Sequence, residues 1–217
     1  EGIQHADTLR PWAYRYRDYV IRALNSDKPY DLFLLEQIAG DELANYEDAD
    51  GFTEEHLDRL VATGFLRMVE DGTNANITNF VPDRQDHIDN EMRVLGSSVL
   101  GLTLHCAKCH SHKFDPVSQA DYFRLRAIFK GAFDEHDWLN PAKRLLPLGH
   151  PEELKRWREN KAAVDAEVAV IKANKELDEE AKKKALEAAE KKRSEQPMVR
   201  ALWDRGQPSP PYLLHRG

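Results

Sequence analysis

Five consecutive residues suggest a definite chemistry: Cys106, Ala107, Lys108, Cys109 and His110. Cys-x-x-Cys-His is the attachment motif of c-type haem. Positions i and i+3 of a helix lie on one face, so both thiols can reach the two vinyl groups of one porphyrin. The imidazole of His110 can then bind the iron as an axial ligand. The pattern therefore predicts one covalently bound haem c, held by Cys106, Cys109 and His110.

Two other interpretations of the cysteine pair stay open. Cys-x-x-Cys can be half of a zinc site, and His110 and His112 would complete a compact Cys2His2 cluster. Such a cluster would be crowded, because structural zinc sites usually join two separated knuckles. The pair can also be a redox-active dithiol. The sequence contains no other cysteine, so no disulfide framework is expected.

Polar residues that follow the motif are candidates for its surroundings. His112, Lys113 and Asp115 are predicted to fix the turn after the haem ligands or to meet a propionate. A purely structural Asp-Pro turn is the alternative. His112 cannot be the second axial ligand, because it is two residues from His110 and cannot reach the opposite haem face.

The sixth iron position has no identified ligand in the sequence. Met92 precedes the motif on an expected helix, where a methionine at helical spacing usually fills the core. His87 and His136 are expected to be ordinary polar residues at the surface. The distal ligand therefore stays unknown, and a vacant or water-filled position is an equal alternative.

The composition argues against several functions. The net charge of −7 gives no basic face for binding nucleic acid. No uninterrupted apolar run approaches the ~20 residues needed to span a bilayer, so no membrane span is expected. Paired carboxylates, a glycine-rich phosphate loop and a serine nucleophile motif are also missing, and none of these enzyme chemistries competes with the haem.

Signals for helix ends are frequent and signals for strands are nearly absent, which predicts an all-α fold. Pro11 and Pro29 suit first helical turns, and Thr53 suits an N-cap before two acidic residues. Apolar residues recur at helical spacing from Arg84 toward Leu104. We therefore expect a small irregular helical haem-binding domain in which a long helix leads into Cys106.

Three segments resemble a planctomycete family of large extracytoplasmic proteins, in which a cytochrome-like domain precedes a second domain of uncharacterised role. They are Trp12–Val20, Asp27–Leu43 and Leu100–Pro116. The third is the most specific, because Cys-x-x-Cys-His-x-His-Lys-Phe-Asp-Pro is long and unusual. The similarity covers about residues 8–133 and resumes at Ala201–Gly206, which resembles the junction with the second domain.

Three regions are predicted on this basis. Residues 1–150 form a cytochrome c-like helical domain that is incomplete at its N-terminus. Residues 151–196, rich in Ala, Glu and Lys, form a projecting antiparallel helical hairpin, with one long solvated helix as the alternative. The proline-rich residues 197–217 form an extended linker toward a missing second domain. The chain starts at Glu1 without a signal peptide, so a piece of a longer protein is expected.

The motif and the resemblance together predict a c-type haem-binding electron-transfer domain, rather than an enzyme by itself. Because haem c is attached after export, the resemblance to extracytoplasmic proteins implies a periplasmic or otherwise extracytoplasmic location. The expected partner is a redox protein or another domain of the parent chain. The alternatives are a zinc-stapled interaction module and a five-coordinate haem that acts on peroxide or a small ligand.

Overall fold

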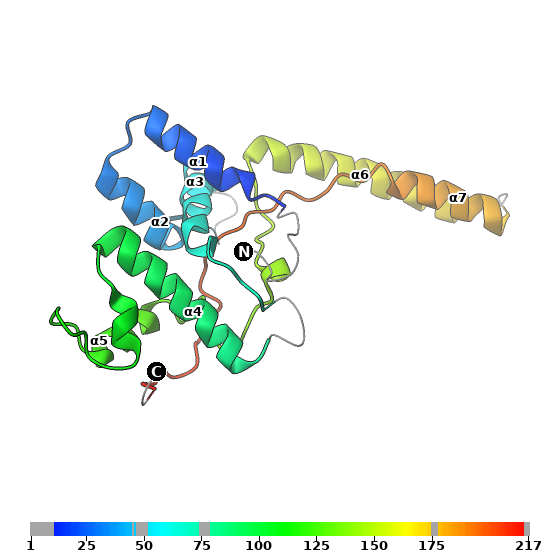
Figure 1. Ribbon diagram of the computed structural model, residues 1–217. Coiled ribbons are helices and arrows are strands. Elements are labelled where there is room, and N and C mark those ends of the chain that lie inside the picture. The colour runs from blue at the N-terminus through cyan, green and yellow to red at the C-terminus, as the bar shows by residue number, and fades with distance from the viewer. Residues whose placement is uncertain (1–10, 45, 47–51, 74–78, 175–177, 215–217) are drawn as a thin grey trace.

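The computed structural model describes residues 11–44, 46, 52–73, 79–174 and 178–214. Seven α-helices make up most of this part of the chain, and no β-strand occurs in it (Figure 1). Leu146 and Val199 form an isolated antiparallel bridge. The all-α fold class predicted from the sequence is confirmed. No described helix is both long and apolar enough to cross a membrane.

The first three helices form one side of the helical body. They are α1 (Tyr14–Asn25), α2 (Tyr30–Ala44) and α3 (Glu54–Ala62). The predicted N-cap is confirmed, because Thr53 Oγ1 accepts a hydrogen bond from the His56 backbone N–H at 3.3 Å. Helices α2 and α3 approach so closely that a Cβ on Gly40 would overlap the carbonyl of Arg59.

The second part of the body contains α4 (Val81–Leu95), the π-turn η3 (Gly96–Leu100), the 3-10 helix η4 (Leu104–Lys108) and α5 (Gln119–Ile128). The helix expected to run toward Leu104 continues from α4 through η3, but it ends at Leu100. Gly96-Ser97-Ser98 are weak helix formers, and Gly101 turns the chain in the left-handed region at φ 65°. The chain then folds back, and Leu104 packs so closely that a Cβ on Gly96 would lie 2.9 Å from its Cδ1.

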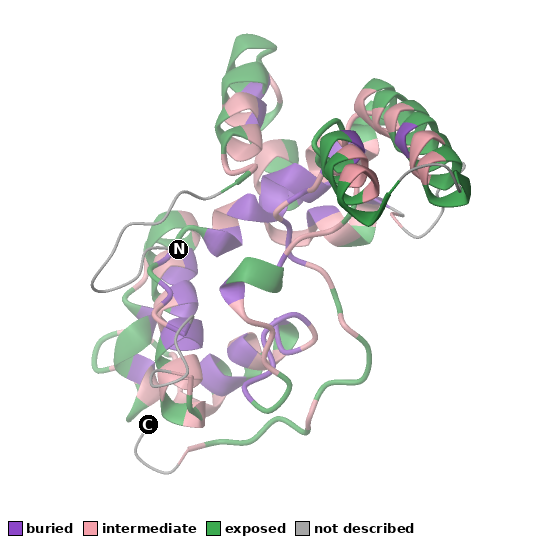
Figure 2. Cartoon of the chain, turned by 90° about the vertical axis from the view of Figure 1, so that its right-hand side faces the viewer, coloured by how far each residue is buried: buried purple, intermediate pink, exposed green. Residues whose placement is uncertain are grey.

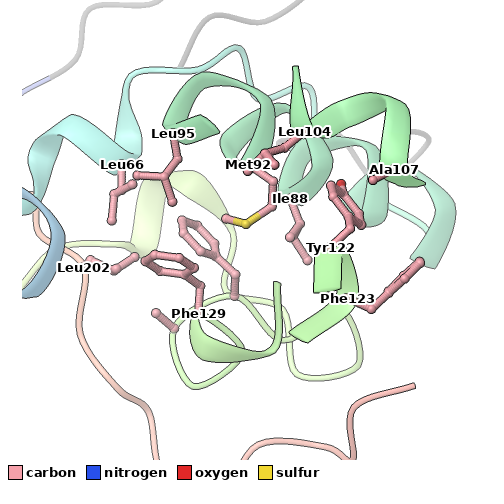
Figure 3. Close-up of a cluster of buried hydrophobic side chains, with 12 residues drawn as sticks. Leu66, Ile88, Met92, Leu95, Leu104, Ala107, Tyr122, Phe123, Phe129 and Leu202 are labelled. Carbon is pink, nitrogen blue, oxygen red and sulfur yellow. The ribbon is translucent and has the colours of Figure 1, made fainter. Parts of the chain in front are cut away.

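A hydrophobic core lies between α4, α5 and η4 (Figure 3). Met92 is completely buried in it, which confirms its interpretation as a core residue. His87 is only 3% exposed, so the expectation of a surface position was wrong. Its ring packs edge-on against Phe133 and Trp138, which cover it from a loop distant in sequence.

Helices α6 (Pro151–Ala173) and α7 (Glu179–Glu190) run antiparallel and project from the body (Figure 1). Most of their surface is exposed (Figure 2), and only Val164 and Ala189 are fully buried in them. The hairpin is confirmed, and the alternative of one continuous helix is wrong. Asn174 leaves the helical region at ψ 117°, and Asp178 caps the start of α7.

The chain returns from the hairpin as an extended segment that crosses the body (Figure 1). It contacts the short 3-10 helix η1 (Thr63–Arg67), and its bridge to Leu146 lies just after the 3-10 helix η5 (Pro141–Lys143). Val199, Ala201 and Leu202 are buried, and the Leu202 N–H donates to Thr63 Oγ1 at 2.7 Å. Residues 197–217, predicted as an extended linker, are thus extended where the structure describes them, and their first part is buried in the helical body.

Candidate functional site

The two motif cysteines lie on a 3-10 turn and not on the α-helix that was expected. Cys106 belongs to η4, and Cys109 is its C-terminal cap, with φ −100° and ψ −25°. Residues i and i+3 eclipse one another in a 3-10 helix, so both cysteines belong to the same side of the turn. Both are free thiols and both are exposed. A 3-10 turn therefore brings residues three apart to one side, as the expected α-helix would.

The opposite side of the same turn is anchored in the core. Leu104 and Ala107 are also three residues apart, and they are 6% and 0% exposed. Their side chains lie among the core residues of α4 and α5 (Figure 3). Gln119 adds a hydrogen bond from its Nε2 to the Lys108 carbonyl at 2.8 Å. The three-residue period thus divides the turn into a buried apolar side and an exposed thiol side.

Lys108, between the two cysteines, ties the motif to a buried carboxylate. Its Nζ lies 2.8 Å from Oδ2 of Asp89, which is 1% exposed on α4. The other carboxylate oxygen accepts from the Tyr122 hydroxyl at 2.6 Å, with Arg126 Nη1 at 3.4 Å. Burial opposes the charge on Lys108, but the bond and attraction to Asp89 outweigh burial and raise the pKa of Lys108.

This anchoring by Asp89 and Tyr122 was missed in the sequence. An aspartate inside the expected helix was the only available signal, and most such residues face solvent. The packing of α5 against α4 puts Tyr122 beside Asp89 and buries both. Burial together with the neighbouring Asp89 raises the pKa of Tyr122 well above its ordinary value, so its hydroxyl remains a donor.

His110 is exposed, and its ring is held by its neighbour. Its Nδ1 lies 2.8 Å from the Ser111 carbonyl oxygen. A carbonyl can only accept, so Nδ1 carries the proton and the lone pair of the neutral ring is on Nε2. A backbone carbonyl often orients a metal-ligating histidine through the ring nitrogen that does not bind the metal. Nε2 is therefore the nitrogen available to a metal.

His112 has a different environment, because both of its ring nitrogens are occupied. The backbone N–H of Asp115 donates to Nδ1 at 3.0 Å, and Nε2 lies 2.9 Å from Thr103 Oγ1. Oδ2 of Asp115 also lies 3.0 Å from Nδ1, an ion pair that would need a protonated ring. The backbone donor to the same nitrogen favours a neutral ring that donates from Nε2. His112 and Asp115 thus stabilise the turn, whereas Lys113 lies over the exposed ring of Phe114 at 5.4 Å.

The predicted site residues therefore separate into two sets. The first set, Cys106, Cys109 and His110, is exposed to solvent. The side chain of His112, in contrast, is only 7% exposed. Among the described residues, no group of three or more His, Cys, Asp or Glu side chains is arranged to hold a metal ion. The four side chains of a Cys2His2 cluster are thus not gathered, and His112 would have to break two hydrogen bonds to join them.

Comparison with known proteins gives one family. The family described as "PSCyt2: Protein of unknown function (DUF1549)" matches residues 1–133, which include the whole Cys-x-x-Cys-His motif. No curated protein and no solved structure matches the chain at a significant level.

Proposed function

Because the chain belongs to the PSCyt2 family, whose function is unknown, we propose a function from the residues of the chain itself. The chain is a c-type haem-binding electron-transfer domain of a larger extracytoplasmic protein. One observation carries this proposal: the two free thiols are exposed on one side of a turn whose other side is anchored in the core. The redox partner is a separate protein or another domain of the parent chain.

The donor set fits a covalently bound haem. Cys106 and Cys109 would each add a sulfur and a hydrogen across one vinyl double bond, which forms two thioethers without loss of any atom. His110 would bind the iron through Nε2, with Nδ1 held by the Ser111 carbonyl. Bound haem iron supplies reversible one-electron chemistry, whose potential depends on the axial ligands and on the polarity around them. Lys108, paired with Asp89, keeps the turn on the body.

The surroundings of the motif also suit an apolar cofactor. Phe114 is 85% exposed and Leu100 is 53% exposed, although both are large apolar side chains. Leu100 ends η3 just before the motif turn, Phe114 follows the motif, and a haem or a docked partner would cover surface of this kind. No distal ligand is assigned, because Met92 is enclosed in the core and His136 lies on a loop elsewhere.

The decisive experiment is the intact mass of protein exported from cells with an active haem c maturation system. The mass should exceed that of the polypeptide by one haem, and Cys106→Ala with Cys109→Ala should abolish the increase. His105→Ala is the matched control, since His105 is exposed beside Cys106 but is outside the motif. A protein of unmodified mass with stoichiometric zinc would refute the proposal.

Spectra then distinguish electron transfer from catalysis on a five-coordinate haem. An electron-transfer site should give a reversible redox titration, with little response to carbon monoxide or cyanide. A high-spin ferric spectrum with ready binding of either ligand would instead support chemistry on peroxide or a small ligand. A precursor that lacks an export signal would contradict the extracytoplasmic location, because haem c is attached after export.

A further inference from the structure

A second candidate site lies away from the cysteine motif, at the start of α1. Here the first turn of α1, the 3-10 helix η1 and the returning segment near Arg200 enclose a small cavity of about 30 Å³. Three arginines line it, namely Arg15, Arg67 and Arg200. The protein carries a net charge of −7, so three guanidinium groups around one cavity depart from its average surface.

One of these arginines has an unsatisfied donor. The Arg15 side chain is 10% exposed, and its Nη2 pairs with the Glu153 carboxylate at 2.7 Å. Its Nε is buried and donates no hydrogen bond within the part of the chain that the structure describes. A buried N–H without an acceptor costs roughly 1–3 kcal/mol, and more when it is charged. An acceptor in the cavity that reached this nitrogen would recover that free energy.

Two aromatic residues, with Ala13, Gly64 and Met68, form the remaining walls. The Arg15 guanidinium carbon lies 5.0 Å from the centre of the Trp12 ring, and Tyr16 lines the same cavity. The backbone of Trp12 is in the left-handed region at φ 68°, which is strained for a bulky residue. Gly64 leaves room for Tyr16, because a Cβ there would lie 3.2 Å from its ring. The strained backbone thus occurs at Trp12, one of the residues that line the cavity.

The size and the chemistry restrict the ligand. A cavity needs ~10–15 Å³ to hold one water, so about 30 Å³ accommodates a group of two or three heavy atoms. Guanidinium groups bind planar carboxylates with two parallel hydrogen bonds, and flat aromatic walls suit a planar group. We propose that this pocket binds the carboxylate group of a small organic acid, separately from the cysteine motif.

The test uses the whole protein, with propionate as the probe and propionamide as its neutral isostere. The indole N–H resonance of Trp12, assigned with Trp12→Phe, should shift saturably with propionate, with Kd on the order of millimolar. Propionamide should leave the resonance unchanged. Phosphate and chloride at equal ionic strength should shift it without saturation. The response should be the same in Cys106→Ala with Cys109→Ala, since the pocket does not use the motif.

Variants identify the residues that bind the probe. Arg15→Gln should weaken propionate binding at least ~10-fold, since it removes the guanidinium charge and its unsatisfied Nε donor. Arg200→Gln is a second variant that keeps the Arg15–Glu153 pair, and it should weaken binding as well. Arg17→Gln is the control, because it removes the same charge from the same helix. The Arg17 side chain is 69% exposed and does not line the pocket. Three results would each overturn the proposal. They are no saturable shift up to ~100 mM propionate, an equal response to propionamide, and equal weakening of binding in Arg17→Gln.

Discussion

Replacing Asp89 with alanine should destabilise the protein severely, although Asp89 is not one of the proposed haem ligands. The carboxylate is 1% exposed, and it pairs with Lys108 and Arg126 and accepts the Tyr122 hydroxyl. Removal of one partner from a buried ion pair costs ~3–5 kcal/mol, because the remaining charge stays buried without compensation.

Lys108 and Arg126 would keep part of their compensation without Asp89, so the expected loss of stability is near the lower limit of this range. The Lys108 side chain is 20% exposed and can recover part of its hydration. Arg126 is 9% exposed but retains Glu135 at 4.0 Å. We therefore expect Asp89→Ala to lower the free energy of unfolding by about 3 kcal/mol. Asp89→Asn should cost less, because its amide oxygen can still accept the Tyr122 hydroxyl.

Urea unfolding at pH 7 measures these values, and Asp86→Asn is the matched control. Asp86 is 76% exposed and lies 3.8 Å from the same Lys108 Nζ, so its loss should change stability by less than ~0.5 kcal/mol. A double-mutant cycle of Asp89→Ala with Lys108→Met should show a coupling above ~1 kcal/mol. Additive effects of the two substitutions, or equal effects of Asp86→Asn and Asp89→Asn, would refute the assigned role of Asp89.

Two further predictions concern other parts of the molecule. Burial, assisted by Arg144, lowers the pKa of His87 from 6.5 to about 4, so the unfolded chain takes up the proton first as the pH falls. His87 should therefore remove about 3 kcal/mol of stability between pH 6.5 and 4. Burial raises the pKa of Asp41 to about 6, which changes stability in the opposite direction over that range. The measurement is thus the difference in unfolding free energy between the wild type and His87→Gln at each pH. A difference that does not change with pH would contradict the prediction for His87. Replacement of residues 158–192 with a Gly-Ser linker should reduce the helical circular dichroism signal. Haem attachment and the urea midpoint of the body should stay unchanged, and a lower midpoint would show that the hairpin stabilises the body.

Local signals explain the parts of the fold that were predicted correctly. The N-cap at Thr53 and the interruption before Asp178 depend on hydrogen bonds between residues three apart, so the sequence contains both partners. The hairpin follows from composition, because a segment with few large apolar residues cannot share a broad core. The end of the helical run at Leu100 was not predicted, because the apolar spacing continues past it and the reversal depends on Gly101 and on Leu104 packing against Gly96.

The sequence alone determined the candidate chemistry of this protein, because two thiols and an imidazole within five residues are a local property of the chain. The tertiary structure decided what surrounds them. Folding placed Asp89 and Tyr122, 17 residues before and 16 residues after Cys106, against the inner side of the motif turn. It also placed Arg15 and Arg200 around the same cavity. These contacts join residues far apart in the chain, and their free energy depends on burial, which no local spacing of residues specifies.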